Sequence, residues 1–385
     1  MRYNDDFLSA RLNERKEQNL LRQLHLPADN IDFCSNDYLG IIRNRLLRNR
    51  PTGLHTGSGG TRTLSGNYRL IESTEEKIAA FHNAEAALIF SSGYDANLGV
   101  LASVPQKGDT LLFDELSHPS VKDGAKITAA QASTFAHNDL SDLKSQLQQA
   151  TGNIFVFTEA VFDADGSKAP LEKMVRLCNE FHAHLIINES HSIGLFGEKG
   201  EGLVYELGLE EVVFARIHGF GNACGCHGAV VMGSEQLKHY LLNFCNQLMH
   251  STTLSEQTVA TIWESYKILP QLWQERTHLN TIIQTFQDAD LQYKKLESDT
   301  PIQHLLVNSL EEANHIAEQI KKTGFDVRPV FYPAVPKGAE RVRVVLHSFN
   351  TRGEVSWLIQ AINGITPVRE ITTSSEDPAA EINAA

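Results

Sequence analysis

Short apolar runs recur along the middle of the chain, and stretches of helical length separate most of them. The runs cover residues 86–90, 110–114, 154–159, 184–189, 212–217 and 228–233. The intervening stretches 141–150 and 171–183 carry apolar residues at the spacing of a helix with one buried face. Near-continuous apolar strands alternating with helices are typical of a mainly parallel sheet covered on both faces. The pattern therefore predicts an α/β fold here.

The pattern changes after about residue 270. Long polar helices are predicted over 274–289 and 310–324, with short strands at 304–309 and 341–348. This mixture is typical of a smaller α+β unit. We therefore expect two domains, a large α/β domain over 51–270 and a small C-terminal α+β domain over 271–366.

The two ends of the chain differ from both predicted domains. Phe7, Leu8 and Leu12 lie at roughly helical spacing among charges, which predicts a surface helix that packs on something else. We expect segment 1–50 as a whole to pack on the small domain. Residues 367–385 contain few large apolar side chains, so we expect a disordered tail.

Composition narrows the class of protein. The 385 residues include 47 acidic and 34 basic side chains, a net charge of -13, and no basic block that could follow a row of phosphates, so we expect no nucleic-acid partner. No stretch resembles a secretory signal or reaches transmembrane length, so we expect no membrane association. Five cysteines, an odd number, favour reduced thiols in the cytoplasm.

Seven segments in order carry a family resemblance from about residue 30 to residue 365. They are FCSNDYLG at 33–40, GSGGTRTLSGNY at 57–68, FSSGYDAN at 90–97, DELSHPSV at 114–121, TEAVFDADG at 158–166, ESHSIGLFGEKGEG at 189–202 and RVRVVLHSFNT at 341–351. Together they resemble the α-oxoamine synthases, in particular the 8-amino-7-oxononanoate synthases.

The resemblance implies a fold-type-I pyridoxal phosphate (PLP) transferase fold, that of aminotransferase class I/II. It also implies a homodimer with sites at the subunit interface. Such enzymes join an amino acid to an acyl thioester, as acyl-CoA or acyl carrier protein, and release carbon dioxide. A lysine holds PLP as an imine, and a carboxylate keeps the ring nitrogen protonated.

Five residues match the cofactor-binding positions of the family. Ser92, Gly93 and Tyr94 stand at a predicted strand-to-helix turn, where free backbone N–H groups can bind a phosphate. His118 matches the histidine that stacks on the ring, and His191 the one near the ring oxygen. The alternatives are an ordinary capped turn and two structural histidines.

Four other positions depart from the family. Asn188 replaces the aspartate that pairs with the ring nitrogen, and Asn222 replaces the imine lysine. Gly219 replaces a phosphate-binding threonine, and Asp163 adds negative charge where a small hydroxyl residue is usual. Glu189 is no substitute for the aspartate, because neighbouring residues on a strand point to opposite faces.

Substrate contacts and the subunit interface look better preserved. The resemblance places Arg343 at the amino-acid carboxylate, Asn36 at the substrate, and Thr252 and Thr253 at the phosphate of the neighbouring subunit. The alternatives are a surface ion pair for Arg343 and a helix cap for the segment 250–257.

One further motif invites a metal interpretation. Cys224, Cys226 and His227 form a C-x-C-H motif, but no second ligand pair accompanies it elsewhere. We expect buried structural cysteines and no metal.

Three functional hypotheses follow. The first is a degenerate α-oxoamine synthase homologue that forms no imine and serves as a non-catalytic subunit, in a homodimer or a heterodimer with an active paralogue, or as a binding protein for an acyl thioester or related metabolite. The second is an enzyme with PLP-independent chemistry at His118, His191, Asp163 or Asn222. The third is non-covalent PLP binding with residual condensation of an amino acid and an acyl thioester.

Overall fold

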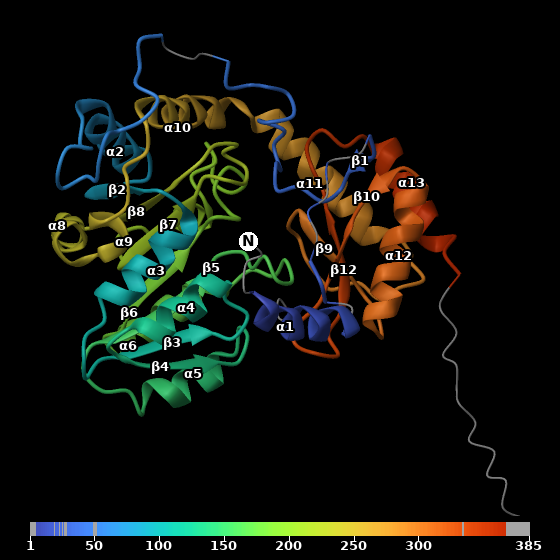
Figure 1. Ribbon diagram of the computed structural model, residues 1–385, viewed down its shortest axis with the longest axis horizontal. Coiled ribbons are helices and arrows are strands. Elements are labelled where there is room, and N and C mark those ends of the chain that lie inside the picture. Colours follow the sequence, from blue (N-terminus) through green and yellow to red (C-terminus); the bar gives the residue numbers. More distant parts are fainter. Residues whose placement is uncertain are drawn as a thin grey trace, which may run out of the picture.

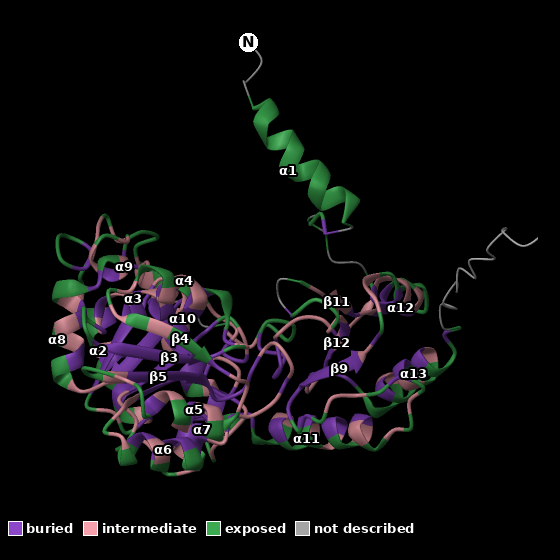
Figure 2. Ribbon diagram, turned by 90° about the horizontal axis from the view of Figure 1, so that it is seen from below, coloured by how far each residue is buried: buried purple, intermediate pink, exposed green. Residues whose placement is uncertain are grey.

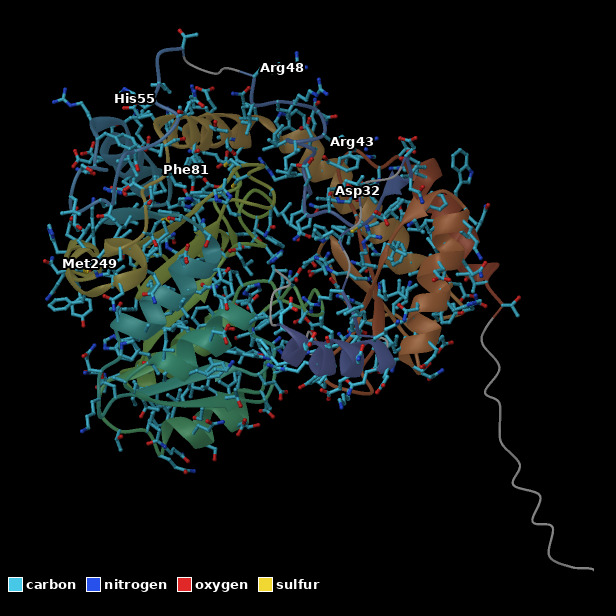
Figure 3. All side chains as sticks on the ribbon, viewed as in Figure 1. Asp32, Arg43, Arg48, His55, Phe81 and Met249 are labelled. Carbon is cyan, nitrogen blue, oxygen red and sulfur yellow. The ribbon has the colours of Figure 1, made fainter. Side chains whose placement is uncertain are left out.

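The computed structural model describes residues 5–18, 20–22, 24, 26, 29–48, 52–332 and 335–366. Two units lie side by side and are joined along one edge by α10 (Glu256–Ile268) and α11 (Trp273–Asp288) (Figure 1). Asp32 lies in the small unit, whereas Phe81 and Met249 lie in the large unit (Figure 3).

A seven-stranded sheet forms the centre of the large unit. Its strand order is β2-β8-β7-β6-β5-β3-β4, in which β4, β3, β5, β6 and β7 are parallel and the pairs β7–β8 and β8–β2 are antiparallel. The strands are β2 (Ala86–Phe90), β3 (Thr110–Asp114), β4 (Gln131–Phe135), β5 (Ile154–Glu159), β6 (His184–Asn188), β7 (Ala215–Gly219) and β8 (Ala229–Gly233). The predicted mainly parallel α/β fold is confirmed.

Helices cover both faces of this sheet. They are α2 (Arg69–Phe81), α3 (Gly93–Ser103), α4 (Pro119–Ile127), α5 (Leu140–Leu147), α6 (Leu171–Glu180), α7 (Leu203–Glu206), α8 (Glu235–Phe244) and α9 (Asn246–Met249). Leu111 and Phe113 of β3 join one buried cluster, with α3 and α8, whereas Leu112 joins another, with α5 and α6. Alternation within an apolar strand thus supplies both faces of the sheet.

The edge strand β4 has no counterpart among the predicted apolar runs. Its sequence, QASTF, is polar, and only Phe135 is buried. An edge strand needs no apolar side chains on its solvent side, so hydrophobic pattern does not reveal it.

The small unit contains a three-stranded antiparallel sheet and a two-stranded parallel one. The first has the order β11-β12-β9, and the second pairs β1 with β10. The elements of this unit are β1 (Ile31–Asp32), β9 (Ile302–Leu306), α12 (Leu310–Lys322), β10 (Phe325–Asp326), β11 (Arg328–Val330), β12 (Arg341–Val345) and α13 (Arg352–Asn363), together with α11; the 3-10 turn Leu269–Gln271 precedes it. A strand from near the N-terminus therefore completes the C-terminal unit.

The N-terminal helix α1 (Asp6–Glu17) differs from its prediction. The expected helix exists, but none of its residues is buried, and it projects away from both units (Figure 2). Phe7 is 75% exposed and Leu12 54% exposed. No described segment of the chain covers these apolar side chains, and the packing of segment 1–50 on the small domain stays a prediction.

Two other expectations concern the ends and the membrane. The predicted tail, 367–385, lies outside the described residues. Within the described ranges, no helix combines the length and the apolar character needed to span a bilayer.

Candidate functional site

A pocket of about 310 Å³ lies at the carboxyl ends of the parallel strands. Loops after β5, β6 and β7 and the first turns of α3 and α4 form its walls. This edge of an open α/β sheet is where such folds bind ligands. Among the residues expected at the site, the lining includes Asn36, Ser92, Gly93, Tyr94, His118, Asp163, Asn188, His191, Gly219 and Asn222.

The first turn of α3 forms one end of the pocket. The Ser92 hydroxyl caps the helix by accepting the Asp95 N–H at 3.0 Å. The backbone N–H groups of Gly93 and Tyr94 have no acceptor among the described residues. The capped turn and the anion-binding turn predicted from sequence are thus compatible, because the cap leaves two N–H donors for an anion.

Ser190 lies beside these donors. Its hydroxyl accepts the Gly219 N–H at 2.8 Å. A Cβ placed on Gly219 would lie 2.8 Å from this oxygen, so the Ser190 hydroxyl stands next to the space that a side chain at position 219 would fill. Sequence reasoning did not identify Ser190, although the resemblance shows a hydroxyl missing at Gly219.

Asn222, which the resemblance places at the position of the imine lysine, lines the pocket, and hydrogen bonds hold its amide on both sides. Its Nδ2 donates to the Ser190 carbonyl at 2.8 Å, and its Oδ1 accepts from the Asn36 Nδ2 at 3.2 Å. An amide nitrogen has negligible nucleophilicity, because its lone pair is delocalised into the carbonyl. This side chain therefore forms part of a fixed wall.

Asn188 lies at the floor of the pocket, at the end of β6. Its Oδ1 accepts the Ser190 N–H at 2.8 Å, and its Nδ2 donates to the Asn97 Oδ1 at 2.9 Å. A neutral amide at this place gives no negative charge to hold a protonated ring nitrogen.

Arg343 on β12 already has a carboxylate partner. Its guanidinium donates to the Asp163 Oδ1 at 2.6 Å and to the Asn36 Oδ1 at 2.9 Å. Burial alone would raise the pKa of Asp163, but the charge of Arg343 lowers it to about 2. The arginine expected to bind a substrate carboxylate is therefore occupied by a carboxylate of its own chain.

His191 contacts both sides of this group. Its Nδ1 lies 2.7 Å from the Tyr38 hydroxyl, and its Nε2 lies 3.8 Å from the Asp163 Oδ1. Burial lowers the pKa of His191 to about 4, despite the opposing charge of Asp163. The imidazole is therefore neutral at pH 7.

Glu159 lines the pocket and was missed from the sequence. It ends β5 and accepts the His118 N–H at 2.6 Å. Burial, reinforced by the negative charge of Asp163, raises the pKa of Glu159 to about 8. The signals in the sequence were its place at the end of an apolar strand and within the segment 158–166 that carries the family resemblance.

Glu189 points away from the pocket, which confirms the prediction from strand alternation. Its buried carboxylate lies 3.1 Å from the His218 Nε2 and accepts the Ser192 hydroxyl at 2.8 Å and the Val204 N–H at 3.0 Å. It takes no part in replacing Asn188.

Thr252 and Thr253 are not brought into the pocket of their own chain. The Thr252 carbonyl accepts the Ser91 hydroxyl at 3.4 Å, and the Thr253 N–H donates to the Gly60 carbonyl at 3.0 Å. The Thr253 hydroxyl is buried and has no hydrogen-bond partner among the described residues. These contacts leave open their expected role toward a neighbouring subunit.

The C-x-C-H motif lies in the loop between β7 and β8. Cys224 is buried, and burial raises the pKa of its thiol to about 12. No group of three or more metal-binding side chains occurs in the part of the chain that the structure describes.

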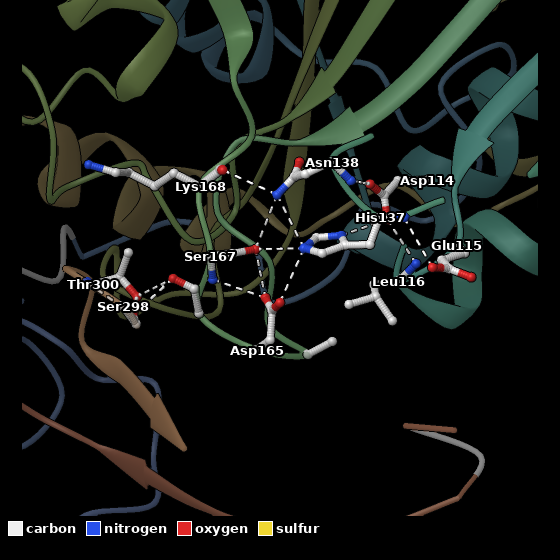
Figure 4. Close-up of polar contacts among 12 residues, drawn as sticks. Asp114, Glu115, Leu116, His137, Asn138, Asp165, Ser167, Lys168, Ser298 and Thr300 are labelled. Carbon is white, nitrogen blue, oxygen red and sulfur yellow. Dashed lines mark hydrogen bonds and ion pairs between the residues drawn. The ribbon is translucent and has the colours of Figure 1, made fainter. Parts of the chain in front are cut away.

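A charged cluster lies behind the loop that carries Asp163. His137 lies between two carboxylates, with its Nδ1 2.9 Å from Asp114 and its Nε2 3.1 Å from Asp165 (Figure 4). Burial alone would lower the pKa of His137, but the hydrogen bonds and charges of the two aspartates raise it to about 9. At pH 7 this histidine is a cation that binds the two carboxylates together.

The small unit holds the same loop from the other side. The hydroxyls of Ser298 and Thr300 donate to the Gly166 carbonyl at 2.9 Å and 3.0 Å (Figure 4). The loop bearing Asp163 is therefore fixed by both units, which supports the short Asp163–Arg343 contact.

Comparison with known proteins agrees with this geometry. Residues 28–362 match the family model described as aminotransferase class I and II. The chain is 34% identical to the 8-amino-7-oxononanoate synthase of Emericella nidulans, over 93% of this chain and 94% of that protein. It is 31% identical to the enzyme of the same name from Cellvibrio japonicus, over 97% and 99%.

Solved structures show the same fold. A serine palmitoyltransferase from S. paucimobilis with a bound PLP-myriocin aldimine superimposes with a TM-score of 0.84 at 22% identity, over 93% of this chain and 96% of that one. The 8-amino-7-oxononanoate synthase of Francisella tularensis gives a TM-score of 0.73 at 26% identity, over 87% and 97%.

The chain therefore belongs to the aminotransferase class I and II family, with the fold-type-I PLP transferase fold. Within that family it is one of the α-oxoamine synthases, the group that includes 8-amino-7-oxononanoate synthase.

The residues of this pocket do not fit a covalently held PLP. An imine needs an amine, but Asn222 presents a tied amide, and no lysine occurs among the described residues that line the pocket. Asn188 brings no negative charge to the floor. The anion-binding end, with Gly93, Tyr94 and Ser190, still matches a phosphate.

Proposed function

We propose that this chain is a non-catalytic member of the α-oxoamine synthases. It forms no imine with PLP and acts as a subunit, or as a binding protein for an acyl thioester or a related metabolite. The observation that carries the proposal is the environment of Asn222. The hydrogen bonds of its side-chain amide to Ser190 and Asn36 give Asn222 a structural role. Catalysis through an imine would need a nucleophilic amine at this position.

The substrate side supports the same proposal. An amino acid would have to displace Asp163 from Arg343, a contact of 2.6 Å in which the guanidinium is largely removed from solvent. Such a charge-assisted pair is stronger than one between two fully exposed side chains. We infer that the amino-acid carboxylate subsite is closed.

Reductive labelling tests the absence of an imine. The protein is mixed with PLP, reduced with borohydride, dialysed and digested for peptide mass spectrometry, with Asn222→Lys treated in parallel as the positive control. We expect no pyridoxyl adduct on a pocket residue of the native chain and a labelled peptide at position 222 of the control. A pyridoxyl adduct on a native pocket residue contradicts the proposal. In a second sample, dialysed without borohydride, retained PLP absorbance favours non-covalent binding.

We further propose that the protein is a dimer in the cytosol, either with itself or with an active paralogue. The exposed apolar side chains of α1 and the position of Thr252 and Thr253 outside their own pocket support an interface. Five free cysteines support a reducing compartment. Light scattering should give twice the chain mass, and a monomeric mass at working concentration contradicts the dimer.

A specific observation favours a second candidate, PLP-independent acid–base chemistry. Glu159 and Asp163 are carboxyl groups of one pocket whose pKa values, about 8 and about 2, are driven far apart. Such divergence is typical of acid and base pairs. Thioester hydrolysis measured with acyl-CoA, in the native chain and in Glu159→Gln, tests this candidate. Turnover that Glu159→Gln abolishes would establish it.

A further inference from the structure

Four side chains form a continuous hydrogen-bond chain from the pocket floor to its wall. Asn188 contacts Asn97 at 2.9 Å, Asn97 contacts Ser120 at 2.9 Å, and Ser120 contacts the Nδ1 of His118 at 2.7 Å. Asn97 and Ser120 are buried, so the chain is shielded from water. Because the two asparagines and the serine each donate and accept, the orientation of one is coupled to the next.

The backbone fixes the direction of the chain at Asn188. A peptide N–H only donates, and the Ser190 N–H points to the Asn188 Oδ1 at 2.8 Å. The Nδ2 of Asn188 must therefore face Asn97 and donate to its Oδ1. The remaining N–H of Asn188 has no partner among the described residues, and Asn188 lines the pocket.

This direction is transmitted to His118. The Asn97 Oδ1 accepts the hydrogen bond from Asn188, so the Asn97 Nδ2 faces Ser120 and donates to its hydroxyl oxygen. The Ser120 hydroxyl is then left to donate to the His118 Nδ1, which also accepts the Ser120 backbone N–H at 3.2 Å. A nitrogen that accepts two hydrogen bonds carries no proton, so the neutral imidazole keeps its proton on Nε2.

We propose that Asn188 sets the polarity of this chain, so that the pocket floor donates a hydrogen bond and the Ser120 hydroxyl, together with the Ser120 N–H, holds His118 as the Nε2–H tautomer. The site then selects a ligand with a hydrogen-bond acceptor at the floor, such as an unprotonated ring nitrogen, and an anionic group at the start of α3. The ligand part rests on the binding function proposed above. The tautomer does not depend on it.

An aspartate at position 188 would reverse every link. Its second oxygen would have to accept from the Asn97 Nδ2, which turns the Asn97 carbonyl toward Ser120. The Ser120 hydroxyl would then donate to Asn97, and its lone pair would face the His118 Nδ1. A proton on Nδ1 would be favoured there, and it would replace the 3.2 Å hydrogen bond that the Ser120 N–H donates to this nitrogen. One substitution at the floor thus changes a histidine on the opposite wall.

Nitrogen-15 chemical shifts of labelled histidine test the polarity, with the His118 signals assigned by their loss in His118→Gln. In the native protein we expect an unprotonated Nδ1 and a protonated Nε2, and in Asn188→Asp a protonated Nδ1. Asn97→Asp should also protonate Nδ1, because the introduced carboxylate would accept the Ser120 hydroxyl while Asn188 still donates. A protonated Nδ1 in the native protein overturns the proposal whether or not either variant folds.

Calorimetry tests whether the pocket floor donates a hydrogen bond to a ligand. The two probes are PLP and an analogue of PLP that has carbon in place of the ring nitrogen. The native protein and Asn97→Asp should both bind PLP about tenfold more tightly than the carbon analogue, the effect of one hydrogen bond. Equal binding of the two probes by the native protein overturns the proposed selectivity. Binding of neither probe, with His118 in the expected tautomer, contradicts the proposed binding function and leaves the chain polarity supported.

Discussion

Two polar clusters lie at the same end of the sheet, and they are built in different ways. The cluster around His137 consists of ion pairs, in which one imidazolium contacts both Asp114 and Asp165. The cluster around Asn222 consists of hydrogen bonds between neutral groups, namely the side-chain amides of Asn222 and Asn36 and the Ser190 carbonyl. The first cluster positions a loop, and the second lines the pocket at the carboxyl ends of the strands. The two clusters thus differ in charge, and membership of the family does not by itself give activity.

The largest expected effect is loss of the charged cluster. His137→Gln removes the cation between Asp114 and Asp165 and should lower the free energy of unfolding at pH 6 by about 3 kcal/mol. The pKa of His137 is raised from 6.5 to about 9, so its contribution is complete below pH 6.5 and is lost as the pH rises through 9. Urea unfolding at pH 6 and pH 10 should therefore show a large difference between native and variant that nearly vanishes at pH 10.

The matched control is His239→Gln on α8. His239 is 73% exposed and lies 4.0 Å from Glu235. We expect a change within about 0.5 kcal/mol at both pH values, as for other surface substitutions. An equal loss in both variants would show that the His137 cluster contributes no special stability.

The second prediction reverses the change at the pocket. Asn222→Lys alone supplies the amine for an imine but leaves the neutral Asn188 at the pocket floor. Asn188→Asp alone supplies a carboxylate for the ring nitrogen but no amine to hold PLP covalently. Since groups of one catalytic unit act non-additively, the double variant should condense alanine with an acyl thioester at least about 100-fold faster than either single variant. Ketone formation and imine absorbance measure this. Full activity of Asn222→Lys alone would refute the role assigned to Asn188.

A third change refines that experiment. Gly219→Thr would restore a phosphate-binding hydroxyl, but its Cβ would lie 2.8 Å from the Ser190 hydroxyl oxygen. We expect it to improve PLP affinity in the double variant only together with Ser190→Ala, by about tenfold for one hydrogen bond to a charged group. Titration of the imine absorbance gives the affinity. The same gain without Ser190→Ala would show that Ser190 moves aside freely.

The fourth prediction concerns Arg343. Asp163→Ser frees its guanidinium, so an added amino acid should bind through its carboxylate about tenfold more tightly than in the native protein. Asp163→Asn is the control that retains shape without charge, and it should give an intermediate gain. Calorimetry with L-alanine measures both, and unchanged affinity in both variants would show that Asp163 does not close the subsite.

The smallest effect is expected at α1. Phe7→Ser with Leu12→Ser should change the stability of the monomeric fold by less than about 0.5 kcal/mol, because both side chains are exposed. If the helix covers a second subunit, light scattering should show that the dimer of this variant dissociates at a higher protein concentration than the native dimer does. If the variant dimer dissociates only at the same protein concentration as the native dimer, α1 is excluded from the interface.

The strands of the large unit were predictable because both faces of the sheet are covered. β2 and β3 coincide with the apolar runs 86–90 and 110–114. The polar edge strand β4 was not predictable, since water takes the place of a packing partner there. The exposure of α1 was not predictable either, because an amphipathic pattern does not say whether the covering surface belongs to the same chain.

The site was predictable as a set of positions, but its connections were not. Asn188 and Asn222 were identified from motifs, and the pocket brings them together. The roles of Ser190 and Glu159 depend on contacts across loops, as when the Ser190 hydroxyl stands beside Gly219. The closing of Arg343 by Asp163 joins residues of two units, and no local pattern indicates such a pair.

The pairing of β1 with β10 has a consequence for synthesis on the ribosome. Ile31 and Asp32 pair with Phe325 and Asp326, so the first strand made has no partner until almost the whole chain has emerged. The large sheet has all its strands long before that point, and domains fold largely as units in order of synthesis. We therefore expect the nascent chain to carry a folded large unit with an unpaired leading segment, and the pocket, which needs Asn36 beside Arg343, to be assembled last.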